Sequence, residues 1–179
     1  MKRWFSLALA FVAVSLGEAQ TLPNEDDPRS GIPFETNRNS SAILIAARVN
    51  GQAATLIVDT GSSNTILSAE LLQVRSSALE RADGPAKGSG FVGTAGWAKA
   101  TVEVGAHKWR DRKVLAMNDF QEISNSMKQR VDGILGADVL KEFDSVVIDF
   151  KHRRLFLCPK GVLSCGLEIP KDCDHPARK

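Results

Sequence analysis

Asp59 stands at the end of an apolar run, and this placement constrains the fold more than any other feature of the sequence. It follows Leu56–Val58 directly and precedes Thr60, Gly61 and Ser62. An acidic side chain at the end of a buried strand carries a desolvation cost unless hydrogen bonds offset it, and such residues are often functional. Gly61 allows a tight turn in which a backbone N–H approaches the carboxylate. The sequence therefore predicts a functional carboxylate in the loop after a strand.

The residues before Asp59 have the pattern of a β-hairpin. Two strand-like segments, 42–49 and 53–58, flank Asn50-Gly51, a dipeptide that favours two-residue hairpin turns. Further strands are expected within 91–104, 114–117, 146–150 and 155–157. Short helices are expected at 66–72, with Ser68 as N-cap, and at 136–143. Many short strands separated by turns are typical of a small closed β-barrel, so we expect an all-β fold.

The N-terminal segment 1–19 has the features of a signal peptide. Lys2 and Arg3 precede a short apolar core, and Ala19 ends a small-residue stretch suited to cleavage. The apolar core is too short to span a bilayer comfortably. We therefore expect an exported protein, periplasmic or secreted, with no stable membrane span once the signal is cleaved. An uncleaved anchor is the alternative.

The rest of the chain divides into three parts. Residues 20–40 are polar, contain several prolines and predict an N-terminal arm or linker; their composition does not decide whether they act as a pro-segment. Residues 41–157 form the predicted domain. The tail 158–179 holds all three cysteines, Cys158, Cys165 and Cys173. Export permits a disulfide between Cys158 and Cys165 or between Cys165 and Cys173, and the sequence does not choose between them.

Charge and histidine content exclude several classes of function. The formal net charge is +2, from 23 basic and 21 acidic residues, which argues against a nucleic-acid partner. The three histidines, His107, His152 and His175, are far apart in the sequence and give no local support to a metal site. We expect neither a metal nor a cofactor.

Two segments together resemble the retropepsin-like aspartic proteases, particularly the single-domain type found in exported bacterial proteins. Asp59-Thr60-Gly61 is similar to the motif around the active aspartate of the family. The segment Gly133–Leu140 resembles the family's hydrophobic-hydrophobic-Gly segment and the short helix after it. The resemblance covers residues 41–157. It implies a small closed acid-protease barrel with one short helix after Ile134-Leu135-Gly136.

The motif occurs once, and this count determines the mechanism that the resemblance implies. Hydrolysis by paired carboxylates needs one ionised group to take a proton from water and one protonated group to donate to the carbonyl oxygen. The resemblance therefore implies a homodimer in which Asp59 from each chain contributes to one dyad, acting on a peptide or protein. The alternatives are a non-catalytic peptide-binding or regulatory domain on the same fold, and a heterodimer.

The resemblance also assigns roles to the neighbours of Asp59. Thr60 is expected to hydrogen-bond across the dimer, and the Ser62 hydroxyl to support the outer carboxylate oxygen. Such a bond favours the ionised carboxylate, so we expect an acid-shifted activity optimum. Ile134 and Leu135 are expected to pack under the loop, with Gly136 permitting a close crossing of chains. Asp138 is expected to be structural.

A Gly-rich stretch between the two motifs is the candidate flap. Retropepsin-like enzymes fold a hairpin from this part of the chain over the substrate, and the resemblance places it within residues 88–97. Its candidate substrate-binding residues are Gly90, Phe91, Val92, Gly93 and Trp97. These residues would contact substrate or exclude water. A solvent-exposed loop with buried anchors is the alternative.

Overall fold

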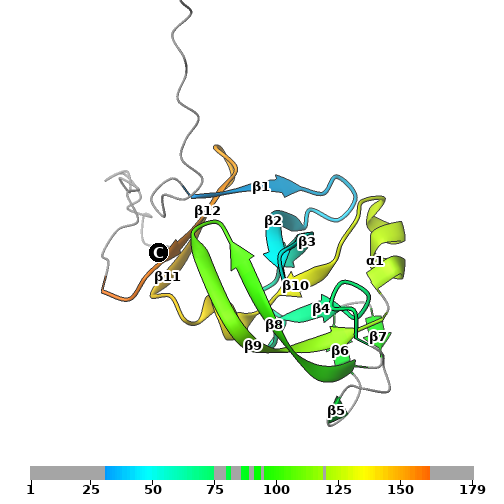
Figure 1. The fold of residues 1–179 in the computed structure, drawn as a ribbon. Coiled ribbons are helices and arrows are strands. Elements are labelled where there is room, and N and C mark those ends of the chain that lie inside the picture. Colours follow the sequence, from blue (N-terminus) through cyan, green and yellow to red (C-terminus); the bar gives the residue numbers. More distant parts are fainter. Residues whose placement is uncertain are drawn as a thin grey trace, which may run out of the picture.

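The structure is a computed structural model that describes residues 31–74, 80–81, 86–88, 91–93, 95–118 and 120–161. Most of these residues lie in strands, with two short helices (Figure 1). The elements are β1 (Ile32–Thr36), β2 (Ile43–Val49), β3 (Gln52–Val58), β4 (Ile66–Ser68), β5 (Glu80–Arg81), β6 (Ala86–Gly88), β7 (Phe91–Gly93), β8 (Ala95–Val104), β9 (His107–Met117), α1 (Phe120–Met127), β10 (Gly133–Leu135), α2 (Ala137–Leu140), β11 (Ser145–Asp149) and β12 (Arg154–Cys158).

Six of the strands close into a barrel. The hydrogen-bonded order β2-β3-β10-β4-β9-β8 returns to its start because β8 also pairs with β2. The pairs β3–β10 and β4–β9 are parallel, and the others around the barrel are antiparallel. The predicted all-β fold with a small closed barrel is therefore confirmed.

The predicted Asn50-Gly51 hairpin joins β2 to β3, and its tip closes the barrel. Asn50 has a φ of 49° and Gly51 a φ of 82°, which is the sign required at both positions of a type I′ turn. The Asn50 N–H donates to Thr101 O at 2.8 Å, and Asn50 Oδ1 accepts from Thr101 N at 2.9 Å. Thr101 lies at the irregularity in β8 between Ala100 and Val102. One side chain thus sets the turn and ties it to β8.

Alternation along the strands creates two apolar cores. Ile45, Leu56, Leu67 and Leu135 point into the barrel and are almost fully buried. Their neighbours in the sequence point outward into a second core, which contains Leu44, Ile66, Leu115, Met117, Phe120, Met127, Val131 and Ile134. Helix α1 supplies Phe120 and Met127 to this second core, so it packs against the outer face of the barrel.

Helix α1 differs from the prediction, which gave little helical character to residues 118–130. Its eight residues present apolar side chains at Phe120, Ile123 and Met127, a helical spacing that is sparse in a polar sequence. The helix ends where Lys128 has a φ of 51°. Asn37 donates from Nδ2 to Met127 O at 2.9 Å and so caps the last turn from the loop between β1 and β2. Figure 1 shows this loop beside the end of α1.

The helix predicted at 66–72 is wrong. Ile66–Ser68 forms β4 instead, because it pairs with β9 on one side and β10 on the other. A turn follows, in which Leu72 N donates to Ser68 O at 3.0 Å and the Ser68 hydroxyl oxygen accepts from Leu71 N at 3.4 Å. Pairing within the barrel therefore overrides a local helical tendency.

The chain ends of the domain also differ from the prediction. β1 lies inside the segment predicted as a polar arm, and it pairs with β2 and with β12. Ile32 and Phe34 are buried, so the domain begins before residue 41. The final hairpin is confirmed as β11–β12. Cys158 is disulfide-bonded, and Cys165 and Cys173 lie outside the described residues, as does the predicted signal peptide.

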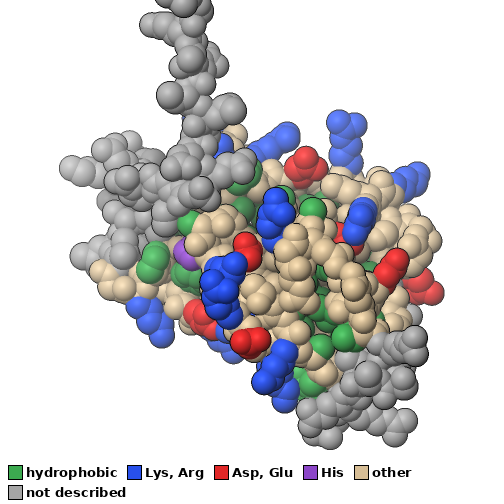
Figure 2. All heavy atoms as spheres, in the orientation of Figure 1, with side chains coloured by type: hydrophobic (Ala, Val, Ile, Leu, Met, Phe, Trp, Pro, Cys, Tyr) green, Lys and Arg blue, Asp and Glu red, His purple; other side chains and the backbone are tan. Residues whose placement is uncertain are grey.

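The described surface carries both charges. On the face in Figure 2, the Lys and Arg side chains are interspersed with Asp and Glu. Neither helix in the described part of the chain has the length and hydrophobicity that a membrane span requires.

Substitution of Asn50 tests the closure of the barrel. Asn50→Ala removes the acceptor for Thr101 N–H and puts a residue less tolerant of positive φ in the turn. We expect the free energy of unfolding to fall by roughly 1–3 kcal/mol in urea denaturation. Asn50→Asp keeps an acceptor and tolerates the same φ, so its loss should be smaller. Equal losses in the two variants would contradict a role for the acceptor.

Candidate active site

Asp59 leaves the barrel where two parallel strands end together. Val58 is the last residue of β3 and pairs with Leu135, the last residue of β10. The Asp59 N–H continues the ladder by donating to Leu135 O at 3.1 Å. The two segments that the sequence singled out are thus adjacent in space, and Asp59 is half-buried at their junction.

A tight turn fixes one oxygen of the Asp59 carboxylate. Gly61 N donates to Asp59 Oδ1 at 2.8 Å, and Ser62 N donates to Asp59 O at 3.3 Å. A Cβ at position 61 would lie 3.1 Å from the same Oδ1, so glycine permits this close approach. Oδ2 accepts no hydrogen bond from the described part of the chain. One carboxylate oxygen is held, and the other is available.

The predicted hydrogen bond from Ser62 to the carboxylate is not made. The Ser62 hydroxyl donates to Asn64 O at 2.8 Å, and a hydroxyl has a single proton to donate. The Ser62 carbonyl accepts from Ala137 N at 2.7 Å, at the start of α2. Ser62 therefore stabilises the loop through its neighbours and not through direct contact with the carboxylate.

The loop after Asp59 is anchored by a close crossing at Gly136. A Cβ there would overlap the Asn64 carbonyl and lie 2.9 Å from Thr65 N, so the predicted close crossing is observed. Thr65 is fully buried, and its hydroxyl accepts from Gly136 N at 3.2 Å and donates to Asp138 Oδ1 at 2.8 Å. Leu135 is fully buried in the barrel core beneath this crossing.

Asp138 belongs to a network that supports the crossing. Arg112 donates from Nη2 to Asp138 O at 2.7 Å and lies 3.4 Å from Asp138 Oδ2. Arg112 also forms an ion pair with Glu142, which accepts from Trp109 Nε1 at 2.8 Å. Partial burial acts to raise the pKa of Glu142, but the hydrogen bonds from Arg112 and Trp109 outweigh it and hold that pKa below its usual value. Asp138 is structural, as the sequence predicted.

A groove of about 690 Å³ opens beside Asp59. Its apolar lining includes Ile57 of β3, Ile134 of β10, and Ile123 and Met127 of α1. Ile134, which was expected to pack under the loop, belongs to the second core and forms part of the groove wall. The described lining residues in full are Ser40, Ala42, Ile57, Val58, Asp59, Glu122, Ile123, Ser126, Met127 and Ile134.

Sequence reasoning missed the contribution of α1 to this groove. The four α1 residues occur as two pairs spaced by four, Glu122 with Ser126 and Ile123 with Met127. This spacing puts all four on one side of a helix. This shared side could be recognised from the sequence only once residues 120–127 were known to form a helix.

The candidate flap residues fall into two parts. Phe91, Val92 and Gly93 form β7, which pairs with β6 in a two-stranded antiparallel hairpin, whereas Gly90 lies outside the described residues. Trp97 lies in β8 of the barrel, packs against the second core and has Lys113 Nζ 4.4 Å from its ring centre. A hairpin is therefore present in the predicted region. Trp97 is not among the described groove residues.

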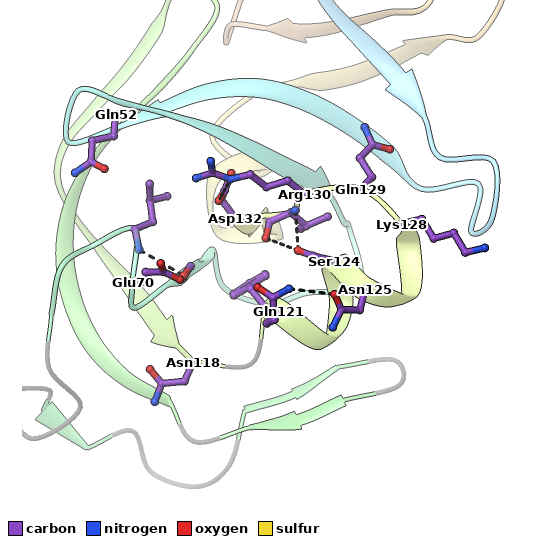
Figure 3. A pocket seen from close by; sticks show the side chains of 14 residues that line it. Gln52, Glu70, Asn118, Gln121, Ser124, Asn125, Lys128, Gln129, Arg130 and Asp132 are labelled. Carbon is purple, nitrogen blue, oxygen red and sulfur yellow. Dashed lines mark hydrogen bonds and ion pairs between the residues drawn. The ribbon is translucent and has the colours of Figure 1, made fainter.

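A second cavity, of about 840 Å³, lies on the other side of α1 (Figure 3). Its lining is mostly polar and includes Asp132, which is buried. Asp132 Oδ2 accepts from Thr55 N at 2.9 Å, and Oδ1 accepts from Arg130 Nε at 2.7 Å. Both carboxylate oxygens are engaged, so Asp132 joins the loop before β10 to β3 and is structural. Asp59 is not part of this cavity.

A family model described as aspartyl protease matches residues 45–139, which include Asp59, the groove residues of α1 and the Gly136 crossing. The chain belongs to this family. No curated protein sequence matches the chain.

One solved structure shows the same fold, and two others are reported as similar. A retropepsin-like aspartic protease from Rickettsia conorii is 21% identical with a TM-score of 0.50, and the match covers 70% of this chain and 89% of that one. The retroviral protease-like domain of Ddi1 from Leishmania major is 20% identical with a TM-score of 0.45, covering 65% and 87%. The EIAV protease in complex with an inhibitor is 16% identical with a TM-score of 0.42, covering 60% and 92%.

Gly136→Ala tests the close packing at the crossing beside the Asp59 loop. Because the added methyl group overlaps the Asn64 carbonyl, the backbone must shift, and we expect the free energy of unfolding to fall by more than about 3 kcal/mol. Gly51→Ala is a matched control: its Cβ meets nothing within 4 Å, and its cost comes from φ alone, about 1 kcal/mol. Urea denaturation measures both, and equal losses would contradict the packing argument.

Glu142→Gln tests the Arg112 network through pH. The pKa of Glu142 is lowered in the folded chain, so its contribution to stability is present above the ordinary value of 4.5 and is lost as pH falls through the lowered one. We expect the melting temperature of the wild type to exceed that of Glu142→Gln near neutral pH, with a difference that shrinks in acid. A difference that grows in acid would contradict the assigned direction.

Proposed function

We propose that this protein is an aspartic endopeptidase that acts as a homodimer, with Asp59 of each chain supplying one carboxylate of the dyad. The observation that supports this most directly is the state of Asp59. One oxygen is fixed by Gly61 N–H, and the other is free to hold water or share a proton at the edge of a groove. In this mechanism one carboxylate takes a proton from water while the other donates to the carbonyl oxygen.

The need for two copies follows from the chemistry and from the sequence. Asp-Thr-Gly occurs once in the chain, and a symmetric pair of identical loops supplies the second carboxylate without a second motif. Thr60 is exposed and makes no hydrogen bond within the described part of the chain, so its hydroxyl is available for the proposed contact across the dimer. The Ser62 hydroxyl donates its proton to Asn64 O and therefore donates none to that contact.

The groove indicates the kind of substrate. Its apolar walls at Ile57, Ile123, Met127 and Ile134 suit the apolar part of a peptide side chain next to the bond that is cut. The hairpin of β6 and β7 is the proposed flap, which would close over the bound peptide and exclude water. The mechanism requires no metal and passes through no covalent intermediate. We further propose that residues 1–19 direct export.

Asp59→Asn tests the proposal. The chain starting at residue 20 is assayed on a mixed peptide library over about pH 3–7 with a pepstatin-type inhibitor, while light scattering records its mass. We expect a wild-type dimer that cleaves peptides, and a variant that still dimerises but loses at least about 1,000-fold in activity. Asp111→Asn, at an exposed aspartate of β9, is the matched control and should retain activity.

Two outcomes would contradict this function. Cleavage by Asp59→Asn at the wild-type rate would show that a group other than Asp59 performs the hydrolysis. A stable wild-type monomer that binds peptides without cleaving them at any pH would favour a peptide-binding domain on the same fold.

A further inference from the structure

The described lining of the groove beside Asp59 carries a charge opposite to that of the whole protein. Its described lining contains two carboxylates, Asp59 and Glu122, and no Lys, Arg or His, whereas the chain as a whole has a formal charge of +2. A cleft lined by one sign of charge with apolar walls concentrates the field and attracts ligands of the opposite sign. The groove therefore favours a cationic group on the ligand.

Helix α1 separates this anionic groove from basic side chains. Its groove side presents Glu122, Ile123, Ser126 and Met127, while Lys128 lines the cavity on the other side. Figure 3 labels Lys128 and Arg130 among the residues that line this second cavity. Arg130 there is engaged by Asp132 through Nε. The arrangement leaves the carboxylates of the groove without a neighbouring cation from α1.

Glu122 is exposed and makes no hydrogen bond or ion pair within the described part of the chain. Asp132, Asp138 and Glu142 all have such partners. Its place in the first turn of α1 suits the helix dipole, but this role does not require the side chain to line a groove. Glu122 is thus a charged group on a ligand-sized groove, close to apolar side chains and without a protein counter-ion.

We propose that Glu122 determines specificity by selecting peptides with a Lys or Arg side chain close to the bond that is cut. The aliphatic stem of such a side chain would lie along Ile123 and Met127, and its charged end would reach the Glu122 carboxylate. Apolar and cationic recognition would then come from the same helix. This inference rests on the proposed peptidase function, because it assigns the substrate class of that same groove.

The test compares peptides that differ by a single side-chain ammonium group. Lysine and norleucine have similar aliphatic stems, so matched peptides carry one or the other at each position around the cleavage site found with the library. We measure kcat/KM above about pH 5, where glutamate in water is ionised. We expect the wild type to prefer lysine by roughly tenfold at one position, mainly through KM, and the preference to weaken with added salt.

Three variants separate charge recognition from helix stability. Glu122→Gln should lower the ratio of kcat/KM for the lysine peptide to that for the norleucine peptide to about one. Glu122→Lys should shift the preference to glutamate at the same position. Glu70→Gln, at an exposed glutamate that lines the second cavity, should leave the preference unchanged. Circular dichroism of each variant checks that α1 and the barrel remain folded.

The outcomes distinguish this inference from the proposed function. Cleavage with equal rates for the paired peptides, or a lysine preference that survives Glu122→Gln, overturns the inference and leaves the peptidase function intact. If no peptide is cleaved, the peptidase function fails, and fluorescence anisotropy with the same peptides decides the role of Glu122. Tighter binding of the lysine peptide that is lost in Glu122→Gln would support the role of Glu122. Equal binding of the two peptides, or a lysine preference that persists in Glu122→Gln, would overturn that role.

Discussion

The crossing of the segment after β10 over the loop after β3 is the constraint on which the site depends. Gly136 lies so close to the Asn64 carbonyl that no side chain fits, and Thr65 joins the two segments through one accepted and one donated hydrogen bond. Asp59 needs this support because its own turn is short and half-exposed. A carboxylate on a flexible loop would lose the geometry that catalysis requires, whereas here both sides of the loop are tied to buried strands.

The barrel supports more than this loop, because its strands are apolar on both faces. Leu56 and Leu135 fill the interior, while Ile57 and Ile134 face outward beside Asp59. Helix α1 covers part of this outer face with Phe120 and Met127, and Asn37 caps its end. The uncovered part remains as the groove. The same alternation that builds a second core thus leaves an apolar wall next to the carboxylate.

The predictions that proved correct rest on local chemistry. Asn50-Gly51 favours one turn type. The segments that contain Asp59 and Gly136 resemble those of a known family, and this resemblance predicted the close crossing of the two segments. The sequence could not reveal α1, because its apolar side chains are few and become significant only against the barrel. β1 was missed for a similar reason, since its burial comes from pairing with distant β12. The predicted hydrogen bond from Ser62 to the Asp59 carboxylate is absent because the Ser62 hydroxyl donates its proton to Asn64 O instead.

The way in which the loop is stabilised bears on its chemistry. The contacts that hold the Asp59 carboxylate and carbonyl within the described chain come from backbone N–H groups. Arg112, which supports the crossing, is occupied by Asp138 and Glu142 and is not among the groove-lining residues. A cation beside Asp59 would cancel part of the negative charge of the groove. Backbone N–H groups fix the position of the carboxylate and add no net charge to the groove. The same support that positions Asp59 therefore leaves the described groove lining anionic.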